Sequence, residues 1–141
     1  MRVLAGALGL VVEEIKSNEF TDYNEWIHVA AFADGQKVSA GGTILGRKHQ
    51  PRIVRLFGQT VEIVPEGVLL LLNNKDKPGM VGYLGTQLNK YSINIAFMSL
   101  SRDEAGGKAL TVLNLDSVPP AALLDELRQD PDISNVRVVK L

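Results

Sequence analysis

The sequence predicts an α+β protein with a β-rich first part and a second part of the order β-α-β-β-α-β. In residues 1–66, short runs of β-branched and apolar residues alternate with turn residues. After them, strand-like runs alternate twice with stretches of helical period. We place the boundary at "VPEG" (64–67), which predicts one unit over residues 1–66 and another over residues 67–141.

The first part is expected to consist of strands joined by tight turns. "NEWIHVAAFA" (24–33) places its larger side chains on alternate sides, as in a half-buried strand. Asp34-Gly35 is a strong signal for a two-residue hairpin turn, and Gly58 marks a second turn. The predicted strands are residues 10–17, 24–33, 36–46, 51–58 and 60–64, with a basic loop at 46–52.

An unbroken apolar run opens the second part. "VLLLLNN" (68–74) has the length and composition of a strand that is covered on both faces. A helix is expected over residues 78–91, with Pro78 in its first turn and Asp76 as its N-cap. Its apolar stripe consists of Met80, Val81, Leu84 and Leu88.

The remaining segments complete the β-α-β-β-α-β order. The predicted elements are a strand at 93–101, a turn at 102–107, an alternating strand at 108–116, a helix opened by Pro119-Pro120 and a strand at 133–141. The inner face of that helix is expected to carry Leu123, Leu124 and Leu127. This order is the ferredoxin-like arrangement, a four-stranded antiparallel sheet with two helices on one face.

Composition excludes several classes of function. The net charge of the 141 residues is −1 and the basic residues are dispersed, which argues against nucleic-acid binding. There is no cysteine, and the two histidines, His28 and His49, are too few for a familiar metal site, so we expect neither a metal nor a thiol nucleophile. The apolar start ends at Glu13-Glu14, too short to span a membrane. A cysteine-free chain fits the cytoplasm.

No catalytic residue is expected in this chain. Neighbouring acidic residues such as Glu13-Glu14 point to opposite sides of a strand and cannot easily work as an acid–base pair. The glycine-rich "GGTILG" lies in a β-rich region with no helix after it, unlike a dinucleotide-binding motif. The ferredoxin-like order also occurs in RNA-binding modules, but "VLLLLNN" and "KALTVLNLD" carry no aromatic residue for base stacking.

The turn "NNKDKPG" (73–79) has two possible roles. In the first, Asp76 only caps the helix and Asn94 only stabilises a turn. In the second, the helix start offers unpaired N–H groups to a carboxylate, and Asp76 accepts an amino group. A neighbouring domain could bring Asn94 to the same place, which would suit a small zwitterion.

Four motifs in order carry a resemblance to a known family. They are "DKPG" at the turn, "GYLGTQL" in the helix, "NIA" in the following strand and "GGKAL" at the hairpin. Together they resemble the ACT domain at the C-terminus of phosphoglycerate dehydrogenases. Upstream, "AGGTILG", "PRIVR" and "PEG" resemble part of the intervening, allosteric-substrate-binding-type domain of the long form of that enzyme.

The resemblance implies a regulatory role. In the family, NAD-dependent catalytic domains precede this region and perform the first committed step of serine biosynthesis, so NAD is expected there and no cofactor on this chain. ACT domains pair edge to edge as dimers and bind L-serine as an inhibitor. By position, the effector contacts would be Asn74, Asp76, Lys77, Gly79, Met80, Val81 and Asn94. Arg52 matches one basic position of a possible anion site in the intervening domain.

Two alternatives remain open at the level of sequence. The β chain of the iron–sulfur L-serine dehydratase shares the same pair of domains, and "INIAFMSLSRDEAGGKAL" resembles it. The pieces "PRIVRLFG" and "VPEG" favour the dehydrogenase. A chain that binds no ligand and serves only as an oligomerisation module is the other alternative.

Overall fold

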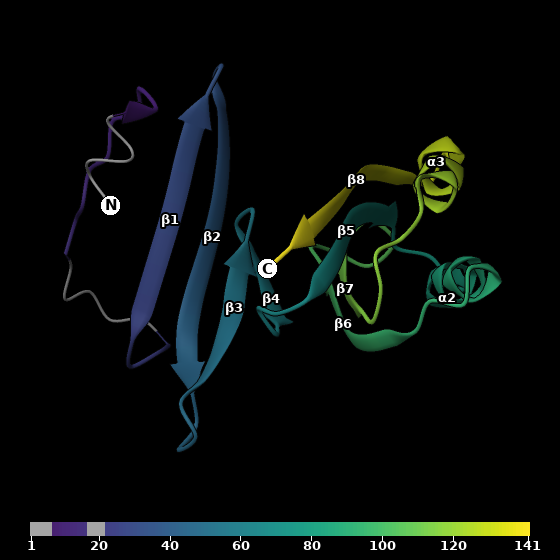
Figure 1. The fold of residues 1–141 in the computed structure, drawn as a ribbon, viewed down its shortest axis with the longest axis horizontal. Helices are drawn as coiled ribbons and strands as arrows, with labels where there is room; N and C mark the ends of the chain where they lie inside the picture. Colours follow the sequence, from purple (N-terminus) through teal and green to yellow (C-terminus); the bar gives the residue numbers. More distant parts are fainter. Residues whose placement is uncertain (1–6, 17–21) are drawn as a thin grey trace.

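A computed structural model describes residues 7–16 and 22–141. They form two four-stranded antiparallel sheets and the helices α2 and α3 (Figure 1). The second sheet lies between the first sheet and the helices (Figure 1). The predicted α+β class is therefore confirmed, and no helix among the described residues is both long and apolar enough to cross a membrane.

The first sheet is a simple meander in the order β1-β2-β3-β4. Its strands are Trp26–Ala33, Gln36–Leu45, Gln50–Leu56 and Gln59–Ile63. The predicted Asp34-Gly35 turn joins β1 to β2, and both residues have positive φ (50° and 74°), as a type I′ turn requires. Phe57 and Gly58 repeat this pattern between β3 and β4 with φ of 51° and 83°.

The strand predicted at 10–17 is not observed. Residues 10–16 have no regular secondary structure and are exposed, and Ser17 lies outside the described residues. A strand needs a neighbour to pair its N–H and C=O groups, and β1 pairs only with β2 among the described residues. Apolar composition alone therefore misled the prediction.

The second sheet has the predicted ferredoxin-like order. Its elements are β5 (Val68–Lys75), α2 (Met80–Lys90), β6 (Ile95–Arg102), β7 (Lys108–Leu115), α3 (Ala121–Gln129) and β8 (Ile133–Lys140). The strands lie in the order β6-β7-β5-β8, all neighbours being antiparallel. This arrangement agrees with an ACT-type fold. The two ends of the unit meet, because Leu141 donates its N–H to the carbonyl of Gly67 over 2.9 Å.

One hydrophobic core joins the helices to the second sheet. It contains Leu70, Leu72, Leu113 and Leu115 from the central strands, Met80, Leu84 and Leu88 from α2, and Leu123 and Leu127 from α3. The predicted stripes are thus largely correct. Val81 is the exception, since its side chain is 51% exposed, and Leu124 lies only partly buried at the margin of the core.

A second core covers the other face of the same sheet. Leu56, Val61 and Ile63 of the β3–β4 hairpin pack on Leu69, Leu71, Leu110 and Val112. The burial of β7 is therefore nearly continuous, where its sequence predicted alternation. The helices cover one face of β7 and the β3–β4 hairpin covers the other, so both sets of side chains are enclosed. The second core contains residues from both sides of position 66. The division into units 1–66 and 67–141 therefore stays a prediction.

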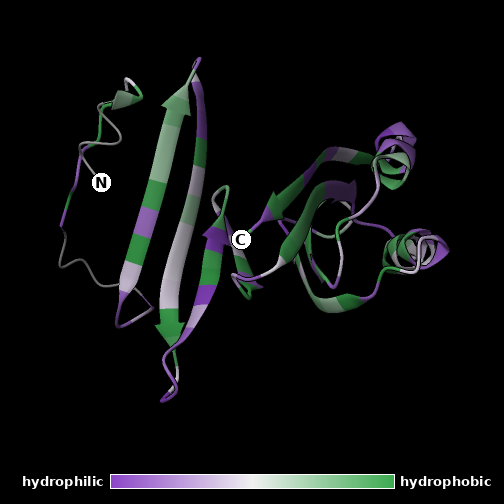
Figure 2. Cartoon of the chain, viewed as in Figure 1, coloured by the Kyte–Doolittle hydropathy of each residue, from purple (hydrophilic) through white to green (hydrophobic). Residues whose placement is uncertain are grey.

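The β1–β2 hairpin extends past the cores. The sequence predicted β1 to be half-buried, but seven of its eight residues are exposed, because no described layer packs on either of its faces. Hydrophobic bands run along it, including Ile27, Val29 and Phe32, whose side chains are 62–74% exposed (Figure 2). Trp26 lies against Gly41, where a Cβ atom would come within 2.2 Å of the indole ring.

Candidate functional site

The turn between β5 and α2 is built differently from the predicted capping arrangement. α2 begins at Met80, and its N-cap is Gly79, with φ of 87° and no side-chain cap. The prediction that Asp76 caps the helix is therefore wrong. Pro78 and Gly79 separate Asp76 from Met80, the first residue of the helix. Gly79 has a left-handed backbone, which glycine adopts without steric cost.

Asp76 instead binds the β6–β7 hairpin. Its Oδ2 accepts hydrogen bonds from Arg102 Nη1 over 3.0 Å and from the backbone N–H of Gly106 over 3.1 Å. Its own N–H donates to the carbonyl of Gly107 over 2.8 Å. The hydrogen bond from Arg102, and next that from Gly106, hold the pKa of Asp76 below its ordinary value of 3.8. Asp76 is therefore an ionised acceptor at the mouth of the turn.

Lys77 contacts the loop before β8. Its ammonium group pairs with the Asp132 carboxylate. This hydrogen bond raises the pKa of Lys77 and lowers the pKa of Asp132. The Lys77 side chain is thus occupied, and an anionic ligand at the turn would meet the backbone N–H groups rather than this ammonium.

Asn74 is enclosed in the sheet. It is 3% exposed, and its Oδ1 accepts a hydrogen bond from the Thr111 hydroxyl over 2.7 Å. Its Nδ2 donates to the carbonyl of Lys75 over 2.9 Å. Each end of the amide has one hydrogen-bond partner within the chain, so a ligand would have to use the second lone pair of Oδ1 or the second N–H of Nδ2.

The predicted helix-start residues fall into two groups. Gly79 and Val81 are exposed, whereas Met80 is buried in the core at 4% exposure. α2 has no acidic residue in its first turn. The partial positive charge of its N-terminus is therefore not offset by its own side chains.

Asn94 lies at the other end of the sheet. It precedes β6, where Ile95 pairs with Leu115, whereas Arg102 at the far end of β6 pairs with Ala109. Eight strand residues separate these ends by roughly 25 Å. Asn94 donates Nδ2 to Asp116 over 2.9 Å. Within one chain the structure therefore does not bring Asn94 to Asp76.

A shallow pocket lies beside the turn. It has a volume of about 240 Å³ and is lined by Asn73, Lys75, Lys108 and Asp132 among others. Lys75 and Lys108 are paired across β5 and β7 at this end of the sheet. Of the predicted effector residues, Asn74 lines this pocket and Asp76 does not.

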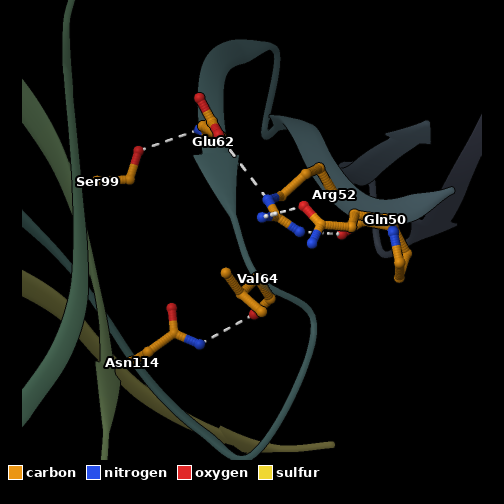
Figure 3. Close-up of polar contacts among 7 residues, drawn as sticks. Gln50, Arg52, Glu62, Val64, Ser99 and Asn114 are labelled. Atoms are coloured by element: carbon orange, nitrogen blue, oxygen red, sulfur yellow. Dashed lines mark hydrogen bonds and ion pairs between the residues drawn. The ribbon is translucent and has the colours of Figure 1, made fainter. Parts of the chain in front are cut away.

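Arg52 lies in a separate place, on β3 of the first sheet. Its Nη1 donates to the carbonyl of Pro51 over 2.8 Å, and its Nε lies 3.8 Å from Glu62 Oε1 (Figure 3). Arg52 also lines a pocket of about 380 Å³ with Trp26 and Ile53. An anion at Arg52 would compete with the Glu62 carboxylate.

Two side chains of the second sheet bind the same β4 segment. Ser99 accepts a hydrogen bond from the Glu62 N–H over 3.1 Å, and Asn114 donates to the Val64 carbonyl over 2.9 Å (Figure 3). Together with the apolar core, these bonds fix the β3–β4 hairpin on the second sheet.

The sequence did not single out Arg102, Gly106 or Asp132. Arg102 and Asp132 are the ion-pair partners of Asp76 and Lys77, and Gly106 has φ of 77°, which lets the hairpin present its N–H. The ferredoxin-like order offered a signal, because it places the second hairpin at the same end of the sheet as the first strand's end. Among residues 7–16 and 22–141, no group of three or more acidic or histidine side chains could hold a metal ion.

Known proteins resemble this chain along nearly its whole length. No protein-family model matches it. D-3-phosphoglycerate dehydrogenase of Methanocaldococcus jannaschii is 37% identical over 131 residues, which cover 93% of this chain and 24% of that protein. The protein of the same name from Bacillus subtilis is 31% identical over 129 residues, 92% of this chain and 24% of the relative. That from Archaeoglobus fulgidus is 30% identical over 135 residues, 94% of this chain and 25% of the relative.

The chain is homologous to a region of the D-3-phosphoglycerate dehydrogenases. The resemblance expected from the sequence motifs is thereby confirmed. The chain spans about a quarter of the length of these phosphoglycerate dehydrogenases. All three relatives are dehydrogenases. This favours the dehydrogenase resemblance over the resemblance to the iron–sulfur serine dehydratase.

Proposed function

We propose that this chain is the C-terminal regulatory region of a phosphoglycerate dehydrogenase and binds a small amino acid, L-serine, as an allosteric effector. In this proposal the catalytic, NAD-binding part is a separate region of the longer relatives, and this chain alone catalyses no reaction. The observation that carries the proposal is the Asp76 turn. Its carboxylate is ionised, and α2 begins at Met80, shortly after Asp76 in the chain, without a side-chain cap, in a chain homologous to these enzymes.

The two charges of an amino acid match this turn. The Asp76 carboxylate suits the ammonium group, because charge-assisted hydrogen bonds are stronger than neutral ones. The N–H groups around Gly79 and Val81 suit the carboxylate, because the helix start carries partial positive charge. Lys77 would contribute through its backbone N–H, since its side chain pairs with Asp132. The Met80 N–H already donates to the Lys77 carbonyl over 3.4 Å and its side chain is buried, so Met80 would shape the helix start.

A second copy would complete the site. β6 is an edge strand of its sheet, so its outer N–H and C=O groups can pair with another β6. Antiparallel pairing of two β6 strands would bring the start of one beside the end of the other. Because Arg102 at the end of β6 holds Asp76, the Asn94 of the second copy would approach the Asp76 turn of the first.

Calorimetry on the purified chain tests this proposal. Titration with L-serine up to millimolar concentration is expected to release or absorb heat at one site per chain, while D-serine serves as the stereochemical control. Asp76→Ala is expected to abolish binding, because the ammonium loses its acceptor. If the folded wild-type chain shows no binding of L-serine or a related amino acid, effector binding is wrong.

A pure oligomerisation module is the second candidate. The observation that favours it is Asn74, a predicted effector residue whose amide already has hydrogen-bond partners in Thr111 and Lys75. Mass measurement by light scattering separates the two. Dimers that persist in a chain that binds no amino acid would support the module, whereas serine binding would support the effector site.

A further inference from the structure

The two hydrogen bonds that Asp76 receives converge on one of its carboxylate oxygens. Both Arg102 Nη1 (3.0 Å) and the Gly106 N–H (3.1 Å) donate to Oδ2. The Asp76 side chain is 18% exposed, so solvent still reaches it although the β6–β7 hairpin binds it. Oδ1 is the oxygen that these two donors leave for a ligand.

We propose that Arg102 is a positioning residue of the effector site, which fixes Asp76 through Oδ2 so that Oδ1 can receive an ammonium group. The proposal rests on the proposed function, since it concerns the same site. It assigns to the β6–β7 hairpin a role in ligand recognition, although neither Arg102 nor Gly106 is expected to touch the ligand.

The glycines of the β6–β7 hairpin also hold Asp76 in place. Gly106 can direct its N–H at Asp76 because its φ is 77°, and the Gly107 carbonyl accepts the Asp76 N–H over 2.8 Å. Side chain and main chain of Asp76 are thus both bound to one hairpin. The carboxylate is oriented before a ligand arrives, which reduces the entropy lost on binding.

Arg102 is bonded to Asp76 directly, whereas the nearby lysines have other partners or positions. Of the nearby lysines, Lys77 pairs with Asp132, while Lys75 and Lys108 line the pocket at the sheet end. Arg102 is the cation that bonds Asp76, and it also accounts for the largest part of the lowered pKa. An ionised Asp76 prefers an ammonium to a neutral amide, so N-acetyl-L-serine should not bind.

Three variants test the assignment in calorimetric titrations with L-serine. Arg102→Ala is expected to weaken binding by about tenfold or more, the value of one charge-assisted hydrogen bond. Arg102→Lys should restore part of the loss, because it keeps a cationic donor. Arg128→Ala is the matched control, since Arg128 also pairs with a carboxylate at 3.1 Å and is 51% exposed against 57% for Arg102. It should bind L-serine like the wild type.

A ligand-free measurement separates positioning from mere stability. Carbon-detected NMR titration of the Asp76 carboxyl should show a midpoint below 3.8 in the wild type and a higher midpoint in Arg102→Ala. The sign follows because removing a donor to the carboxylate makes protonation easier. Far-UV circular dichroism of each variant confirms that the fold is kept, and Arg102→Gln replaces Arg102→Ala if the latter does not fold.

The outcomes distinguish the two proposals. If the wild type binds L-serine and Arg102→Ala binds equally well, or the Asp76 midpoint does not move, positioning by Arg102 is overturned while effector binding stands. If the wild type binds no amino acid, the proposed function fails, and the assignment of Arg102 to a ligand site fails with it.

Discussion

Two strands of this chain place similar side chains in opposite surroundings. β7, "KALTVLNL", has seven of its eight residues buried, whereas β1, "WIHVAAFA", has seven of eight exposed. β7 lies between two strands and between two layers, the helices and the β3–β4 hairpin. β1 is an edge strand that pairs only with β2 among the described residues. An apolar pattern therefore shows what a strand can bury, and the neighbouring layers decide whether burial occurs.

The comparison predicts where substitutions are costly. In β7, a side chain removed from either face leaves a hole that packed neighbours must fill. In the β1–β2 hairpin, water already contacts most of the side chains, so the folded and unfolded environments differ little. Three substitutions test this contrast, in order of decreasing expected effect.

The largest effect is expected from Leu113→Ala. Leu113 has no exposed surface and lies in the core beneath the helices. Its truncation should lower the free energy of unfolding by about 2–5 kcal/mol, the range for buried leucines. Urea denaturation followed by circular dichroism measures the change. Leu100→Ala, at a position that is 41% exposed, is the control, and an equal loss there would contradict the comparison.

An intermediate effect is expected from Thr111→Val. Thr111 is fully buried and its hydroxyl is the donor to Asn74 Oδ1, so valine keeps the shape but leaves a buried amide oxygen without that bond. The loss should be about 1–3 kcal/mol. Thermal and urea unfolding measure it, with Thr60→Val on the exposed side of β4 as the control. No loss at Thr111 would mean that Asn74 finds another donor.

The smallest effect is expected from Val29→Thr. Val29 is 62% exposed, and threonine keeps its β-branched shape and strand preference. The free energy of unfolding should change by about 0.5 kcal/mol or less, as is usual for surface positions. The same urea experiment measures it. A loss comparable to that of Leu113→Ala would show that a layer covers β1 in solution.

The sequence predicted the second sheet well because its signals are local. The run of leucines in β5 and the spacing of Met80, Leu84 and Leu88 each define one element and one buried face. The order of elements then leaves few ways to assemble them. Val81 was predicted to lie on the buried face of the helix but is exposed. Spacing alone does not show how wide the buried face of a helix is.

The first sheet and the site were harder to predict because they depend on distant residues. Residues 10–16 have a strand-like composition, but pairing needs a partner that composition does not reveal. Asp76 was identified as important, yet its role as an N-cap was wrong, because its donors come from Arg102 and Gly106 about 26–30 residues later. Contacts at that separation follow from the topology, which fixes which strand ends coincide.

The hydrogen bond from Leu141 to Gly67 makes the second unit almost circular. β5 and β8 lie side by side, with Val68 paired to Lys140. The start of β5 and the end of β8 are therefore close together. A short linker could join these ends, and new termini could be opened in a surface turn such as 103–107, provided that the contacts of Asp76 are kept. A label attached at Leu141 would likewise lie next to the segment that leads from β4 into β5.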